Sequence, residues 1–173
     1  MSSTLKSGVN MQSGNALVGI KVSNADLIAK AEANLRAACA RLVVSHGFFA
    51  GPVLRKRWIP SEAAPTIGTD GRDLYYNPAW IAARSIPECI GLLVHEACHD
   101  LGLHMFREQG RDIIVCDAEG HAVKLWNIAC DTQCNQVVAD CGLSVPPGGV
   151  APVADSTAEA EYEKLAKKAK KLP

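Results

Sequence analysis

The stretch Leu92-Leu93-Val94-His95-Glu96-Ala97-Cys98-His99-Asp100-Leu101 places the pattern His-Glu-x-x-His inside an apolar run. In a helix, His95 and His99 stand one turn apart on one face. Two imidazoles so placed can hold one Zn²⁺ at about 2.0–2.1 Å each. Glu96 is rotated by about 100° from His95 around the helix, so it can lie beside the metal without binding it. The stretch therefore predicts a metal-binding helix at the centre of the fold.

The pattern also predicts a chemistry, because the second residue of His-Glu-x-x-His is the general base of zinc peptidases. In this chain that residue is Glu96. Three fixed residues recur by chance, so the remainder of the chain must supply a third ligand and a wall for substrate. Catalytic zinc usually has three protein ligands and one water.

Two candidates for the third ligand follow from spacing. His104 falls one residue short of the last histidine in the longer pattern His-Glu-x-x-His-x-x-Gly-x-x-His, in which Gly102 would be the glycine. Asp131 is the stronger candidate, because a buried carboxylate is costly without a cation. Asn127 and Asn135 flank it at steps of four on the same predicted helical face, where they can support the metal ligands from behind.

Two readings compete with this site. Cys130 and Cys134 stand one turn apart and with the two histidines would complete a structural Cys₂His₂ zinc site. Histidines in a core without metal are also common.

Helix-start signals divide the chain into elements. Ser23 to Asp26 and Ser85 to Glu88 are capping boxes, which begin helices that we expect to end near Ser45 and Met105. Ser156 to Glu159 is a third box and begins a charged helix. Another long helix is expected from about Ala122 to Cys141, after a loop over residues 107–120 with a short strand near Ile113.

A hairpin is expected ahead of the metal helix. Ile67 to Thr69 and Leu74 to Tyr76 form its strands around an Asp-Gly turn, and Asn77 caps a short helix. We expect its second strand to be an exposed edge that pairs with an extended peptide. Tyr75, Tyr76 and His104 are candidates for stabilising an oxyanion. The basic triplet at residues 55–57 reads as a solvated patch.

Composition limits the class of protein. The 173 residues are 48% hydrophobic and 21% charged with a net charge of 0, so a packed core is feasible and neither nucleic acid nor membrane is an expected partner. Seven cysteines without a signal peptide indicate reduced thiols and a cytoplasmic protein. We expect an α+β fold, mainly helical with a small hairpin. Its predicted parts are a flexible arm over residues 1–22, a domain over 23–155, and a charged helix or linker over 156–173.

Beyond the zinc motif, the order and spacing of residues over about 45–165 resemble a known family. The chain is similar to the putative metallopeptidase domain of bacteria and phages, often followed by a von Willebrand factor A-like domain. The resemblance implies a zincin-like fold with a site at His95, Glu96, His99 and Asp131. Cys98 stands where the family more often has an aliphatic residue, and the chain stops where the second domain would begin. The residues that carry the resemblance are Thr69–Gly71, Tyr75–Pro78, Leu93–His99, His104, Trp126–Asp131, Asn135, Gly142 and Pro146–Gly149.

Two functions are open at this point. One is a zinc-dependent peptidase that binds one Zn²⁺ and acts on a protein or peptide substrate, with Glu96 as general base. The other is a non-catalytic zinc module for partner assembly or recognition. For that second function the family resemblance suggests an AAA ATPase or a von Willebrand-type protein as partner.

Overall fold

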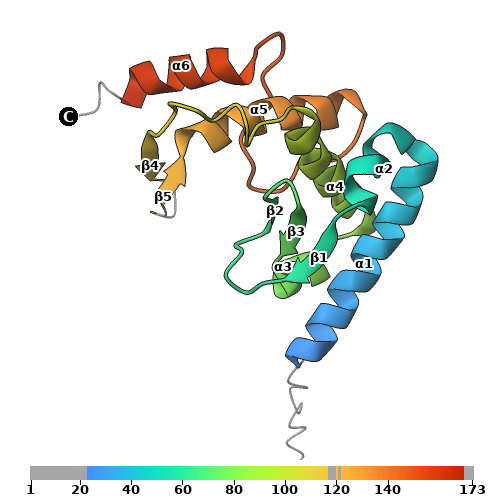
Figure 1. Ribbon diagram of the computed structural model, residues 1–173. Coiled ribbons are helices and arrows are strands. Elements are labelled where there is room, and N and C mark those ends of the chain that lie inside the picture. Colours follow the sequence, from blue (N-terminus) through green and yellow to red (C-terminus); the bar gives the residue numbers. More distant parts are fainter. Residues whose placement is uncertain (1–22, 117–119, 121, 170–173) are drawn as a thin grey trace, which may run out of the picture.

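The computed structural model describes residues 23–116, 120 and 122–169. The predicted arm over residues 1–22 therefore lies outside the described residues. Figure 1 shows helix α4 in the middle of the molecule, with α1 and α2 on one side and α5 crossing it on the other. The elements are α1 (Asn24–Ser45), α2 (Gly47–Leu54), β1 (Arg57–Pro60), β2 (Ile67–Thr69), β3 (Asp73–Tyr76), α3 (Pro78–Ala82), α4 (Ile86–Leu101), β4 (Ile114–Cys116), β5 (Ala122–Lys124), α5 (Leu125–Asp140) and α6 (Ala158–Ala169).

The capping boxes at the starts of α1 and α4 are confirmed. The Ser23 hydroxyl accepts from the Asp26 backbone N–H, and the Asp26 carboxylate accepts from the backbone N–H of Ser23. Ser85 and Glu88 do the same at α4. These reciprocal bonds satisfy backbone donors that the first turn of a helix leaves free, and so fix where each helix begins.

Helix α4 is the core element. Every residue from Cys89 to Cys98 is buried, which is the pattern of a helix surrounded on all sides. The helix ends at Leu101 rather than near Met105, because Gly102 caps it and Leu103 takes a left-handed conformation with φ of 51°. The chain turns back there, and the His104 backbone N–H donates to the His99 carbonyl.

The expected hairpin forms, but its edge is not the expected one. Strand β2 pairs antiparallel with β3, and β1 pairs with β3 in parallel, so the sheet order is β1-β3-β2. The strand with Tyr75 and Tyr76 is thus central, and the edge strands are β1 and β2. The prediction of an exposed β3 edge was wrong because β1, a strand brought in from residues 57–60, covers it.

The basic triplet is a solvated patch at Arg55 and Arg57 but not at Lys56. The Lys56 ammonium is buried and lies 2.7 Å from Asp100 Oδ2, and it donates to Thr69 Oγ1 at 2.6 Å. Arg57 forms a two-pronged salt bridge with Asp73 on β3, its Nη2 lying 2.6 Å from Oδ2. Lys56 therefore joins elements inside the fold, whereas Arg57 forms its salt bridge at the surface with 67% of its side chain exposed, and Arg55 is exposed as predicted.

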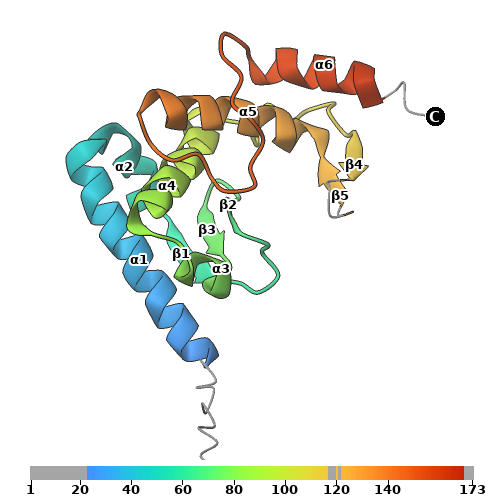
Figure 2. The same cartoon turned by 180° about the vertical axis from the view of Figure 1, so that it is seen from behind.

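The region after α4 holds a second, two-stranded sheet. Residues 122–124 form β5 with β4, so the helix α5 begins at Leu125 rather than at Ala122. The loop after α5 folds back over it, because the Val153 N–H donates to the Thr132 carbonyl at 3.4 Å (Figure 2).

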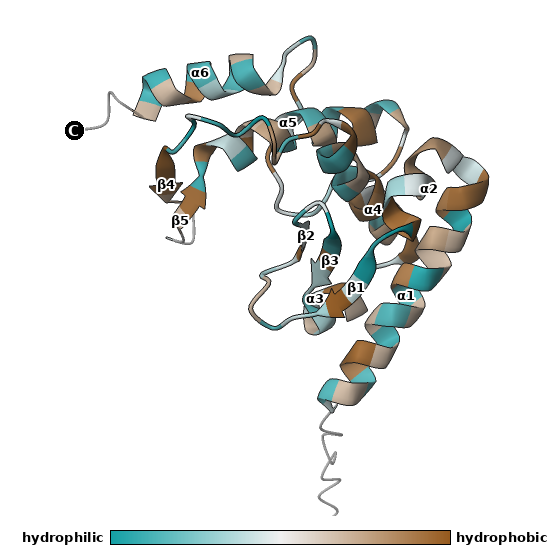
Figure 3. Ribbon diagram, viewed as in Figure 1, coloured by the Kyte–Doolittle hydropathy of each residue, from teal (hydrophilic) through white to brown (hydrophobic). Residues whose placement is uncertain are grey.

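The last helix, α6, is charged yet packed. Figure 3 shows a largely hydrophilic ribbon, but Ala158, Tyr162 and Ala166 are buried against α5. Its cap differs from the predicted one: Thr157 Oγ1 accepts from the Ala160 N–H, while Ser156 Oγ donates to Glu161. No helix in the described part of the chain is long and apolar enough to cross a bilayer.

Candidate metal centre

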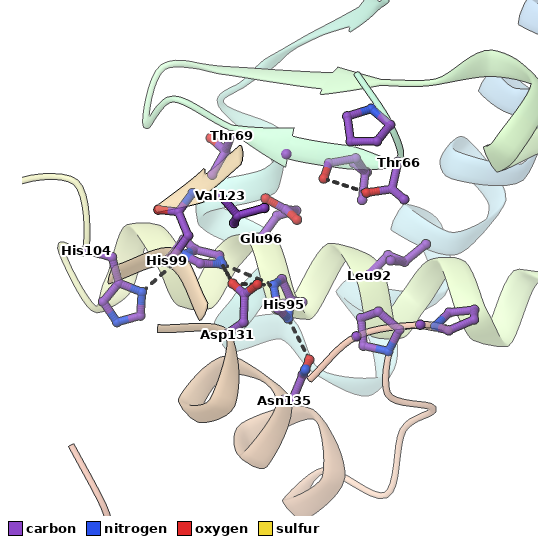
Figure 4. A pocket seen from close by; sticks show the side chains of 18 of the residues that line it. Thr66, Thr69, Leu92, His95, Glu96, His99, His104, Val123, Asp131 and Asn135 are labelled. Atoms are coloured by element: carbon purple, nitrogen blue, oxygen red, sulfur yellow. Dashed lines mark hydrogen bonds and ion pairs between the residues drawn. The ribbon is translucent and has the colours of Figure 1, made fainter. Parts of the chain in front are cut away.

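Two histidines and an aspartate converge where α4 crosses α5 (Figure 4). His95 Nε2 and His99 Nε2 lie 3.1 Å apart. Asp131 Oδ1 lies 3.1 Å from His99 Nε2 and 3.5 Å from His95 Nε2. Ligand atoms about 2.0–2.2 Å from one tetrahedral ion are themselves roughly 3.3 Å apart, so the three separations match a shared metal. The metal ligands predicted on two separate helices, α4 and α5, therefore lie side by side in the structure.

His95 is held in place by Asn135. The His95 Nδ1–H donates to Asn135 Oδ1 at 2.8 Å. The orientation of this amide follows from its other end, because Asn135 Nδ2 donates to the Val150 carbonyl at 2.7 Å. Asn135 is fully buried, so the arrangement is rigid. With its proton on Nδ1, His95 presents the Nε2 lone pair to the centre.

His99 is supported in the same way by His104. The two Nδ1 atoms lie 3.2 Å apart, and with His99 Nε2 left free for a metal the Nδ1–H of His99 donates to His104. Burial lowers the pKa of His104 to about 4, so its ring is neutral and able to accept. The Trp126 indole N–H holds the His104 carbonyl at 2.8 Å. The structure thus places His104 behind His99 rather than beside Asp131.

The charges of the centre favour a cation. Two Nε2 lone pairs 3.1 Å apart repel each other unless a proton or a metal lies between them. Burial opposes protonation of His95, yet the hydrogen bond to Asp131 and the charge of Glu96 outweigh it and raise the pKa of His95 to about 9. Burial likewise opposes ionisation of Asp131, but hydrogen bonds from His95 and His99 hold its pKa well below the usual range. The arrangement that favours positive charge on His95 also favours a bound metal cation, so these residues fit a metal.

Glu96 lies beside this centre without joining it. Its side chain is nearly buried, and its carboxylate has no hydrogen-bond partner among the described residues. Burial raises the pKa of Glu96. With a raised pKa, the Glu96 carboxylate accepts a proton more readily than an exposed glutamate does, and it also lines the cavity.

That cavity has a volume of about 600 Å³. Edge strand β2 bounds it on one side, and the centre lies on its floor. The loop after α5 closes the end next to Leu92, with Pro146 to Gly149. This loop is pressed against α4: a Cβ added to Gly91 would lie 2.1 Å from the Ser144 carbonyl oxygen. Residues from three separate segments therefore surround the imidazoles.

The other residues proposed from sequence lie in different places. Asn127 lines the cavity. Tyr75 and Tyr76 do not line it: the Tyr75 hydroxyl donates to Asp70 at 3.2 Å, and Tyr76 is fully buried within the sheet core. Their predicted roles near the metal are not supported, because the Tyr75 hydroxyl is engaged by Asp70 and the Tyr76 side chain lies in the core.

Cysteine offers a further ligand at the centre. A nitrogen of His95, a nitrogen of His99 and Cys134 Sγ all lie within 4.8 Å of one another. Cys130, the other member of the predicted Cys₂His₂ set, is buried instead in the cluster between α5 and α6. The chain therefore holds a group of side chains that can bind a metal ion, but not the predicted pair of cysteines.

Sequence reasoning missed the part played by Gly102. A Cβ at this position would lie 2.4 Å from His104 Nε2, so only glycine leaves space for the ring. The signal available in the sequence was a glycine at the end of the metal helix, two residues before a histidine.

Comparison with known proteins supports a family assignment. No curated protein and no solved structure matches the chain. A family profile described as "Putative metallopeptidase domain" matches residues 30–170, which run from α1 to the end of α6. The chain belongs to this putative metallopeptidase domain family.

Proposed function

We propose that this protein is a zinc-dependent peptidase in which His95, His99 and Asp131 hold one Zn²⁺ and Glu96 is the general base. The observation that carries the proposal is the convergence of two Nε2 atoms and one carboxylate oxygen at 3.1–3.5 Å, beside a glutamate that lines the cavity and has no hydrogen-bond partner among the described residues. Family membership supports the reaction class.

The residues have distinct tasks in this proposal. Bound here, Zn²⁺ would supply a Lewis acid that lowers the pKa of water and polarises a carbonyl. Glu96 takes a proton from a water in the cavity and later gives it to the leaving amine. Its burial supports both steps, because a carboxylate with a raised pKa accepts and returns a proton at neutral pH with less cost. Asn135 and His104 keep the imidazoles oriented throughout.

The substrate is an extended peptide that lies along β2. This strand is an edge of its sheet, and residues 65–69 line the cavity above Glu96. An edge strand offers free backbone N–H and C=O groups, which pair with a peptide of any sequence. The backbone of β2 therefore supplies binding, and the cavity beneath it supplies the chemistry.

The test is cleavage of an unfolded, fluorescently labelled protein by wild-type enzyme and by Glu96→Gln, each with its metal content measured. We expect the variant to keep its metal and to lose activity by at least about a hundredfold, the usual contribution of a general base. Glu163→Gln, at an exposed position on α6, is the matched control and should be fully active. Full activity of Glu96→Gln with metal bound would exclude the role of Glu96.

One observation favours a second candidate function, a non-catalytic zinc module. Cys134 Sγ lies within 4.8 Å of both imidazoles, and four protein ligands would make a closed, structural site. In that case metal removal lowers the melting temperature and there is no activity to lose.

A further inference from the structure

His99 has a second face that the proposed reaction does not use as a ligand. Its Nδ1 lies 3.2 Å from His104 Nδ1, and that atom lies 3.8 Å from Cys134 Sγ. A nitrogen of His99 and Cys134 Sγ are within 4.8 Å of each other. His104 Nδ1 therefore lies close to two further donor atoms of the type that bind zinc, His99 Nδ1 and Cys134 Sγ.

The two separations measured from His104 Nδ1 suit an ion bound by these atoms. With zinc–nitrogen distances of about 2.0–2.1 Å and a zinc–sulfur distance of about 2.3 Å, they correspond to angles of roughly 100° between the two nitrogens and 120° between nitrogen and sulfur. Both values are near the tetrahedral angle. His104 and Cys134 are already fixed by their surroundings, since both are buried.

A separate cavity leads to this second group of donor atoms. A cavity of about 480 Å³ lies between α2, the end of α4 and α5. It is lined by His104 and Cys134 together with Cys98, Phe49 and Leu101. His104 lines both this cavity and the first one. An ion can therefore approach Cys134 without passing through the proposed active site.

We propose that His99 Nδ1, His104 Nδ1 and Cys134 Sγ form a second site, for a borderline or soft transition-metal ion of the Zn²⁺ class. Binding releases the Cys134 thiol proton and the Nδ1 proton of His99, while His104 binds through its free Nδ1 lone pair. The added charges then sum to zero: +2 from the ion, −1 from the thiolate and −1 from the bridging imidazolate. A neutral assembly is what a buried position requires.

The order of filling follows from this proton balance. Filling the first site displaces one proton, shared between the two Nε2 atoms, whereas filling the second displaces two, from the Cys134 thiol and from His99 Nδ1. The second site is therefore weaker and fills only when metal exceeds one equivalent. Once filled, it replaces the hydrogen bond from His99 to His104 by a metal bridge, so excess metal acts on the ligand shell of the first ion.

Titration of the metal-free chain with Co²⁺ tests the inference, because a thiolate ligand gives cobalt an intense near-ultraviolet charge-transfer band. The protein carries Cys116→Ser, which removes an exposed thiol. We expect two equivalents to bind, with no thiolate band during the first and a full band during the second. Cys134→Ser and Cys134→Ala should each bind one equivalent without the band. Cys130→Ser, one turn away on the same helix, should bind two and keep it.

Two results would overturn the inference in different ways. Saturation at one equivalent without a thiolate band removes the second site and leaves the proposed peptidase centre intact. A thiolate band that grows with the first equivalent places Cys134 in the primary site, which contradicts both the inference and the assignment of Asp131.

Discussion

The His104 ring lies over Gly102 so closely that a Cβ on the glycine would stand 2.4 Å from His104 Nε2 and 2.8 Å from its Cδ2. Glycine at the end of α4 is therefore what allows His104 to reach back to His99. The same contact explains why His104 is not a ligand of the first ion: its Nδ1 faces His99 Nδ1, on the far side of that ring from Asp131.

Gly102→Ala should displace His104 and leave His99 Nδ1 without its acceptor. Loss of a partner that orients a metal-binding histidine typically weakens metal binding by about 10–100-fold, and we expect a value in that range by competition with a chelator. Gly51→Ala in α2 is the matched control, because nothing lies within 4 Å of the added Cβ. Equal zinc affinity in both variants would contradict the role given to His104.

Asn135→Ala should weaken metal binding to a similar extent. The change removes the acceptor of the His95 Nδ1–H and leaves the Val150 carbonyl unpaired. Asn127→Ala is the control at the same helical spacing; Asn127 lines the cavity but has no hydrogen bond within the described residues. Isothermal titration with zinc separates the two variants, and equal losses of affinity would show that Asn135 has no special part.

Lys56→Met should destabilise the fold strongly. Lys56 is buried against Asp100, whose Oδ1 already has no hydrogen-bond partner, and removal of the cation leaves an uncompensated carboxylate. A cost of about 3–5 kcal/mol in the free energy of unfolding is usual for breaking a buried pair. Lys56→Met with Asp100→Leu should recover much of this loss in urea unfolding. Additive losses in the double variant would mean that the pair is not coupled.

The metal-free chain should lose stability in alkaline solution. The pKa of His95 is about 9 in the fold against about 6.5 when unfolded, so its contribution is complete below pH 6.5 and disappears as the pH rises through about 9. Between pH 6 and pH 9.5 the change is about 3 kcal/mol in the free energy of unfolding. Urea unfolding at pH 6 and at pH 9.5, with a chelator present, should show it in the wild type. Asp131→Asn should show a much smaller change, and an equal one would contradict the ion pair.

The sequence predicts elements well where the signal is local. The capping boxes at Ser23 and Ser85 place the starts of α1 and α4, because their bonds lie within one helical turn. The Asp-Gly turn places the hairpin for the same reason. At the site, the helical spacing of His95 and His99, and the polar face that carries Asp131 and Asn135, were also readable.

The local sequence did not predict elements whose formation depends on contacts with residues distant in the chain. Strand β1 exists because residues 57–60 pair in parallel with β3, which the local sequence does not encode. Helix α2 forms although Gly47 and Pro52 are poor helix formers, since Ala50 and Val53 are buried in the core. Lys56 looked like part of a solvated patch because its partners, Asp100 and Thr69, are distant in sequence. Tertiary contacts decide each of these cases.

Zinc content per chain, measured after removal of excess metal, tests the central assignment most directly. Wild type, Asp131→Asn and Cys134→Ser should be compared at equal protein concentration, with folding checked by circular dichroism. We predict about one zinc in the wild type and in Cys134→Ser, and loss of most zinc in Asp131→Asn, because three protein ligands are the usual set of a catalytic site. Full zinc in Asp131→Asn together with loss of zinc in Cys134→Ser would contradict the account.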